Sequence, residues 1–142
     1  MSEQSLAFVV EGVPQAQGSM KSFGRGRVVH SNPKLTAWRT KVLAKAVSEA
    51  RTQKWNPRPD TPLKVTAYFF FERPKHTKYG AYPAGKPDLD KLQRAIGDAL
   101  SPKYGTKIIA DDARIVQWRA KKYWVNTGGK PGVYIEIETL EN

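Results

Sequence analysis

The chain has 142 residues, of which 39% are hydrophobic, so it is long enough for one domain with a core and too short for two. Lys and Arg number 24 against 13 Asp and Glu, and the resulting net charge of +11 favours an anionic partner such as nucleic acid. Because the sequence has neither a long apolar run nor a secretory leader, we expect a cytoplasmic protein that does not enter a membrane. The absence of cysteine excludes disulfides, thiolate metal sites and cysteine nucleophiles.

The first half of the chain predicts a strand, a basic arm and a long helix. Apolar residues 6–10 form the strand, which ends at a Gly-Val-Pro turn. Residues 15–31 mix glycines with basic side chains and form the arm, with a second short strand at 28–29. Asn32 is a good N-cap, a proline follows it, and apolar residues then recur at helical spacing, which predicts a helix over about 34–53.

The second half predicts a strand at 63–71, a loop at 72–87, a helix at 88–100 and two further strands at 115–124 and 133–138. In the helix, the apolar residues share one face, which places Asp90, Arg94 and Asp98 on the opposite face. The elements together predict a single α+β domain over residues 1–142. It has a small, mainly antiparallel or mixed sheet with two helices packed on it.

Acidic residues are concentrated in one short part of this basic chain. Five of its six aspartates fall between residues 88 and 112, namely Asp88, Asp90, Asp98, Asp111 and Asp112. Each has a structural explanation when taken alone, since the first two suit a helix N-terminus, Asp98 forms a ladder with Arg94, and the doublet suits a turn. If the strand after Asp112 packs beside the N-terminus of the second helix, however, three or four carboxylates converge.

A converged cluster of this kind requires a cation. Each like-charge pair at about 4 Å costs roughly 4 kcal/mol at an effective dielectric of about 20. Carboxylate oxygens suit Mg²⁺, with Mn²⁺ as the alternative, and no small-molecule cofactor is expected. Such a metal acts on a phosphodiester, and Arg94, with Lys91 beside it, would face the charge that develops on the phosphate oxygens.

Basic side chains in the arm, the loop, the helix at 88–100 and the strand at 115–124 are candidates for binding the DNA backbone. They are Lys21, Arg25, Arg27, Lys75, Lys78, Lys86, Lys91, Arg119 and Lys121. Tyr79 and Tyr82 either stack on unpaired bases or anchor the loop by packing. The sequence does not show which surface dimerises, and the large aromatic residues of the strands favour core positions.

A motif of about 30 residues carries a family resemblance. It consists of Lys86-Pro87-Asp88-Leu89-Asp90-Lys91-Leu92, then Arg94, then Asp98-Ala99-Leu100, and finally Asp111-Asp112. This order resembles the RusA family of Holliday-junction resolvases, and the opening strand, its turn and the basic arm follow the same order as in that family.

The resemblance implies a RusA-like fold and Mg²⁺-dependent cleavage of branched DNA by a homodimer. Such an enzyme resolves four-way junctions by paired symmetric nicks in recombination and repair, and small resolvases of this type often belong to phages. By motif position, Asp88, Asp90 and Asp112 would be the catalytic, metal-binding aspartates, with Asp111 supporting them. Asp98, on the same helix face as Arg94, would position that side chain.

Two positions depart from the family pattern, because its asparagine is Lys91 here and its catalytic lysine is Arg94. Arginine keeps the charge but does not easily give up a proton. If the family lysine donates a proton, this chain is impaired, whereas if it stabilises charge, Arg94 suffices, and we expect the latter. The alternatives are a non-catalytic protein of the same fold that binds branched DNA, a nucleotide-sugar transferase and a Ca²⁺ module. The chain is short for a transferase and lacks the glycine and final glutamate of an EF-hand loop.

Overall fold

The computed structural model describes residues 3–18, 21–23, 27–29, 32–126 and 128–141. A four-stranded sheet in the order β1-β6-β4-β5 forms its centre, with bounds β1 (Ser5–Glu11), β4 (Leu63–Phe71), β5 (Ile115–Trp124) and β6 (Gly132–Thr139). The pairs β1–β6 and β6–β4 are antiparallel, whereas β4–β5 is parallel. The sheet is therefore mixed, and the predicted α+β architecture is confirmed.

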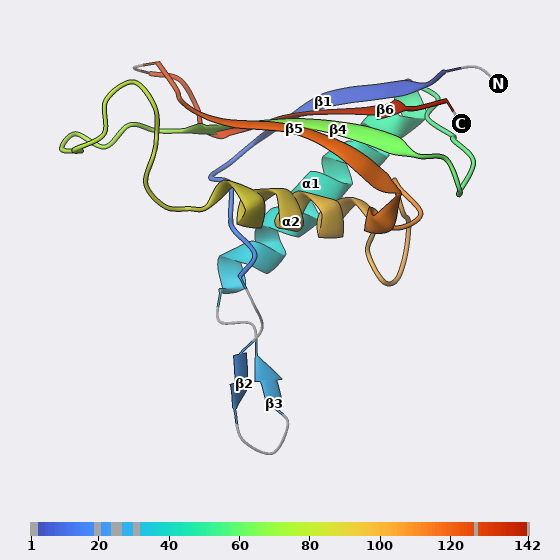
Figure 1. Cartoon of the computed structure of the whole chain (residues 1–142), viewed down its shortest axis with the longest axis horizontal. Helices are drawn as coiled ribbons and strands as arrows, with labels where there is room; N and C mark the ends of the chain where they lie inside the picture. Colours follow the sequence, from blue (N-terminus) through green and yellow to red (C-terminus); the bar gives the residue numbers. More distant parts are fainter. Residues whose placement is uncertain (1–2, 19–20, 24–26, 30–31, 127, 142) are drawn as a thin grey trace.

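Both helices, α1 (Pro33–Thr52) and α2 (Leu89–Leu100), cover the same face of this sheet (Figure 1). Asn32 caps α1 as predicted, because its side chain accepts a hydrogen bond of 3.0 Å from the backbone N–H of Lys34. The predicted arm contains a small antiparallel pair, β2 (Lys21–Phe23) and β3 (Arg27–Val29). Within the described ranges, no helix is both long and apolar enough to cross a membrane.

The core lies between the sheet and the two helices. Alternate residues of each strand point toward it, and the fully buried Phe69 of β4 is the largest of them. Trp38 and Val42 of α1, and Ile96 of α2, are buried against this layer at the helical spacing that the sequence predicted. Because the apolar residues of α2 are buried against this layer, only the opposite side of that helix remains available for chemistry.

The parallel pairing of β4 with β5 determines the direction of α2. Because α2 connects two parallel neighbouring strands, it runs back against them (Figure 1). Its N-terminus therefore lies near the ends of β4 and β5, and its last turns lie near the start of β5. A short 3-10 turn, η1 (Asp112–Arg114), leads into β5 at that second end.

The opposite face of the sheet carries no further layer among the described residues (Figure 1). Four aromatic side chains meet on it. The Tyr68 ring lies 5.8 Å from that of Tyr123 and 6.0 Å from that of Tyr134, and the rings of Phe70 and Tyr123 stack at 5.5 Å. Desolvation by these neighbours, followed by the nearby Glu136, raises the pKa of Tyr134.

Candidate functional site

The N-terminus of α2 presents a carboxylate that is not used for capping. Asp88 occupies the N-cap position, yet its side chain makes no capping hydrogen bond. It lies 3.4 Å from Lys91 Nζ, and 45% of its side chain is exposed. Asp90 follows in the first turn and is exposed. Both acids favour the positive end of the helix dipole, but their oxygens remain accessible to another ligand.

Lys122 holds the loop that leads into this helix. From the inner face of β5, its Nζ donates hydrogen bonds of 2.8 Å to the carbonyl of Gly85 and 2.9 Å to that of Pro87. The two carbonyls belong to the residues on either side of Lys86, and the second of these residues, Pro87, immediately precedes Asp88. A lysine at this position was not selected from the sequence, because the contact joins segments 35 residues apart. Lys122 therefore fixes where the first aspartate stands.

We expect Lys122→Met to destabilise the fold by about 1–3 kcal/mol, because two carbonyls lose a charged donor while the alkyl packing is kept. The nuclease activity that the sequence resemblance implies should fall further than the folded fraction does, since the loop before Asp88 loses its anchor. Urea unfolding followed by fluorescence, together with a cleavage assay, would measure both effects. Lys103→Met, at an exposed position, is the matched control and should change neither quantity, whereas equal behaviour of the two variants would contradict the anchoring role.

A shallow pocket of about 210 Å³ lies along the outer side of α2 and the start of β5. Its lining consists of Asp90, Gln93, Arg94, Gly97, Asp112, Ile115 and Trp118. Two of the predicted catalytic aspartates and the predicted cationic residue thus share one cavity. Gly97 lies beside η1, because a Cβ placed at Gly97 would be in ordinary van der Waals contact with the Cβ of Asp112, at 3.7 Å.

The doublet at the start of η1 has two different electrostatic roles. Asp111 accepts a hydrogen bond of 2.8 Å from the backbone N–H of Ala113, and this bond lowers its pKa. The pKa of Asp112 is raised, first by its side-chain hydrogen bond with Asp111, then by desolvation and by the charge of Asp98. Asp111 therefore stabilises the turn, while Asp112 carries a charge that a cation would stabilise.

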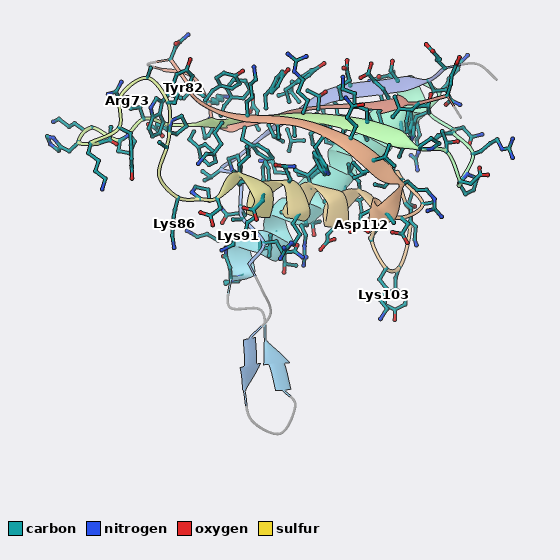
Figure 2. The ribbon with its side chains drawn as sticks, viewed as in Figure 1. Arg73, Tyr82, Lys86, Lys91, Lys103 and Asp112 are labelled. Carbon is teal, nitrogen blue, oxygen red and sulfur yellow. The ribbon has the colours of Figure 1, made fainter. Side chains whose placement is uncertain are left out.

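In the part of the chain that the structure describes, three carboxylates do not converge on one point. Among the described residues, no three acidic or histidine side chains form a group that could hold a metal ion. The reason is the direction of α2, which places Asp112 beside Gly97 rather than beside the helix N-terminus. At 1.5 Å per residue, Asp88 and Gly97 are about 13 Å apart along the helix axis. Figure 2 shows Asp112 at the opposite end of α2 from Lys91.

Asp98 is held by a residue that was not selected from the sequence. The side-chain amide of Gln17 donates to Asp98 Oδ2, and Arg39 Nη1 donates to Gln17 Oε1 at 2.9 Å. The backbone N–H of Gln17 also donates to the carbonyl of Lys91 at 3.0 Å. Gln17 is buried, so this network fixes the base of the arm to both helices. Asp98 thus anchors the arm, and it forms no ion pair with Arg94 among the described residues.

The predicted DNA-binding side chains fall into separate groups. Those of the loop, Lys75, Lys78 and Lys86, are exposed, and Lys86 lies at the start of α2 (Figure 2). Arg119 and Lys121 alternate with the inward-facing Trp118 and therefore lie on the open face of the sheet, away from the pocket. Arg25, and the side chains of Lys21 and Arg27, lie outside the described part of the chain.

The loop tyrosines differ from each other. Tyr79 is half-buried and packs against Gly85, where an added Cβ would clash with its ring. It lines an apolar cleft of about 330 Å³ beside the start of α2, together with Phe71, Pro83 and Trp124. Tyr82 is 68% exposed. Tyr79 therefore anchors the loop by packing, whereas the ring of Tyr82 is exposed to solvent.

The donor set is compatible in kind with Mg²⁺. Asp90 and Asp112 offer hard oxygen ligands on one pocket, and Mg²⁺ typically takes only one or two protein carboxylates while retaining water and binding a phosphate. Arg94, on the same pocket, supplies a cation for the phosphate itself. The arrangement can bind a phosphodiester together with a divalent ion.

Comparison with known families gives a match over nearly the whole chain. The model of the family described as Endodeoxyribonuclease RusA matches residues 10–138. A comparison with curated proteins found no match.

Proposed function

The chain belongs to the RusA endodeoxyribonuclease family, and we propose that it is a Mg²⁺-dependent nuclease that resolves four-way DNA junctions during recombination and repair. The observation that carries this proposal is the pocket that Asp90, Arg94 and Asp112 line together. The pocket places two carboxylates, which can bind a metal ion, together with a guanidinium group, which can bind a phosphate. The net charge of +11 gives the surrounding protein the sign that a DNA substrate requires.

In this proposal the metal-binding aspartates are Asp90 and Asp112, which line the pocket, and Asp88, which stands at the helix N-terminus. When bound, Mg²⁺ would polarise the phosphodiester and lower the pKa of the attacking water. Arg94 would bind a non-bridging phosphate oxygen and stabilise the charge that grows on it in the transition state. Lys86 and the loop lysines would orient the flanking backbone.

Paired nicks require two equivalent sites. A four-way junction has approximate two-fold symmetry, so a homodimer with two-fold symmetry applies the same pocket to both strands. We therefore propose that the active species is a homodimer and that the two nicks lie symmetrically about the branch point.

A synthetic four-way junction with each strand labelled in turn tests this function. We expect Mg²⁺-dependent nicks at symmetric positions in two opposing strands, and little cleavage of a linear duplex of the same sequence. Junction binding without any cleavage would identify a non-catalytic binding protein instead. The ion pair between Lys91 and Asp88 is the feature that favours this second function, because it engages one of the proposed metal ligands.

Junction affinity should depend steeply on salt. Each phosphate contact contributes about −0.9 to the slope of log K against log salt on duplex arms. We expect the double variant Lys75→Ala/Lys78→Ala to lower the slope by about two contacts, measured by fluorescence anisotropy. Arg58→Ala is the control, since Arg58 pairs with Asp60 at 3.7 Å and lies outside the basic loop. A slope unaffected by the loop substitutions would show that the loop does not bind the backbone.

A further inference from the structure

The apolar cleft of about 330 Å³ beside the start of α2 is a second concave site, and it shares no residue with the pocket that Asp90 and Asp112 line. The proposed nuclease chemistry does not use it. Aromatic rings and prolines make up most of its lining, namely Phe71, Pro74, Tyr79, Pro83, Pro87 and Trp124. A cleft with this lining suits a flat, apolar group that stacks on aromatic rings.

Hydrogen bonds fasten the loop that surrounds this cleft. The indole Nε1 of Trp124 donates to the carbonyl of Gly80 at 3.0 Å, and Arg73 Nη2 donates to the carbonyl of Tyr79 at 3.2 Å. Lys122 fastens the loop at the end that joins α2, through the two carbonyls described above. The aromatic walls are therefore in position before a ligand binds, which reduces the entropic cost of binding.

The charge around the cleft suits a nucleotide. Its lining contains two lysines, Lys86 and Lys122, against one acid, Glu72. Lys78 of the same loop is exposed, and its Nζ lies 5.4 Å from the centre of the Tyr79 ring. A nucleotide matches this combination, because its base stacks on aromatic rings and its phosphate is attracted to the lysines. An apolar peptide segment would use the rings but not the positive charge.

The cleft ends where the candidate site begins. Lys86 and Pro87 line the cleft, and the next residue is Asp88. Asp90, two residues further, lines the pocket. Figure 2 shows Lys86 at the start of α2. A DNA strand whose phosphate lies over the first turn of α2 therefore has the cleft beside it, within reach of the base of a neighbouring nucleotide.

We propose that this cleft binds one unstacked nucleobase of the junction, from a nucleotide at the branch point. In a continuous duplex every base is paired and stacked, so placing one in the cleft requires its extrusion. Extrusion costs least where a base is already unpaired, so the cleft favours branched DNA over linear duplex. The inference rests on the proposed function and deepens it, because it names residues that distinguish a junction from a duplex.

Photocross-linking in the presence of a chelator tests whether a base occupies the cleft. A synthetic four-way junction carries one 5-iodouracil, either at a nucleotide of the branch point or in the middle of an arm, and mass spectrometry identifies the cross-linked residue. We expect the branch-point probe to react with Phe71, Tyr79 or Trp124, and the arm probe to react elsewhere. The proposal fails if the branch-point probe does not reach these residues, or if both probes reach them equally.

Two glycines of the loop provide matched variants. A Cβ at Gly85 would lie 2.6 Å from a ring atom of Tyr79, whereas a Cβ at Gly80 would meet nothing within 4 Å. Gly85→Ala should therefore displace the Tyr79 ring and lower junction affinity by about tenfold, with duplex affinity unchanged. Gly80→Ala should change neither. Fluorescence anisotropy in the chelator measures both affinities, and equal junction affinities of the two variants would contradict the proposal.

A second set of variants keeps the backbone of the loop intact. Tyr79→Leu removes one aromatic wall and should lower junction affinity by about tenfold, whereas Tyr79→Phe should bind like the wild type because stacking needs only the ring. Tyr104→Leu is the control, since Tyr104 is 80% exposed and also lies beside a lysine, with Lys103 Nζ 5.7 Å from its ring centre. Thermal unfolding shows whether each variant is folded. Wild-type junction affinity in folded Tyr79→Leu would overturn the proposal.

These measurements are independent of cleavage. A chain that cleaves junctions but cross-links outside the cleft loses this inference alone. A chain that does not cleave, yet cross-links through the cleft and discriminates between junction and duplex, loses the nuclease proposal alone. A wild type that binds the junction and the linear duplex equally well would overturn the role of the cleft in selecting branched DNA.

Discussion

Asp112→Asn should reduce junction cleavage by at least about 100-fold while junction binding is kept. Mutation of a residue that hydrogen-bonds to a metal ligand typically lowers metal affinity or activity by about 10–100-fold. Asp112 is itself a proposed ligand. Its charge is unfavourable in the absence of a cation, as its raised pKa shows. The folded protein should therefore be at least as stable in the variant, and binding should persist or tighten because a negative charge is removed. Single-turnover cleavage, anisotropy and thermal unfolding measure the three quantities.

Two comparisons isolate this effect from a general loss of charge. Asp111→Asn should have a smaller effect, because an asparagine oxygen still caps Ala113. Asp60→Asn removes an exposed carboxylate outside the pocket and should leave cleavage unchanged. If Asp112→Asn cleaves like the wild type, Asp112 does not bind the catalytic ion, and if it is unfolded, its role is structural.

Arg94→Ala should lower kcat for cleavage by about 10²–10³, the usual cost of removing one donor from developing transition-state charge. Arg94→Lys should retain most of the activity, because a cation remains on the pocket shared with Asp112. The change should appear in the single-turnover rate at saturating protein, with little change in junction Kd.

The comparison of the two Arg94 variants decides how this position acts. Activity retained in Arg94→Lys supports charge stabilisation, and a large increase over the wild type would instead show that a proton donor is missing in the natural chain. Gln93→Ala, at the next position on the same pocket, is the matched control and should have a much smaller effect. Unaltered cleavage by Arg94→Ala would remove Arg94 from the mechanism.

The elements could be predicted from local patterns because each carries its own periodicity. The apolar stripe of α2 and the cap at Asn32 are determined within a few residues, and the structure confirms both. Strand order is not a local property. The parallel pairing of β4 with β5 depends on which strands meet after the chain has crossed the sheet, and no turn residue signals it.

That same pairing explains what the sequence predicted correctly and incorrectly about the site. Asp90 and Arg94 are one helical turn apart, so their shared face followed from spacing alone. Asp112 does not lie near the N-terminus of α2. Because α2 runs antiparallel to β5, Gly97, near the C-terminal end of the helix, lies beside Asp112. Gln17 and Lys122 were not selected because their partners lie far away in the sequence. Long-range hydrogen bonds leave no periodic signal.

The most direct test of the nuclease is cleavage of one synthetic four-way junction by the wild-type protein with Mg²⁺ and with a chelator in its place. We predict symmetric nicks with Mg²⁺, none with the chelator, and full recovery when Mg²⁺ is restored in excess. Equal cleavage under both conditions would contradict the metal-dependent account. Binding without cleavage in the presence of Mg²⁺ would contradict the nuclease itself.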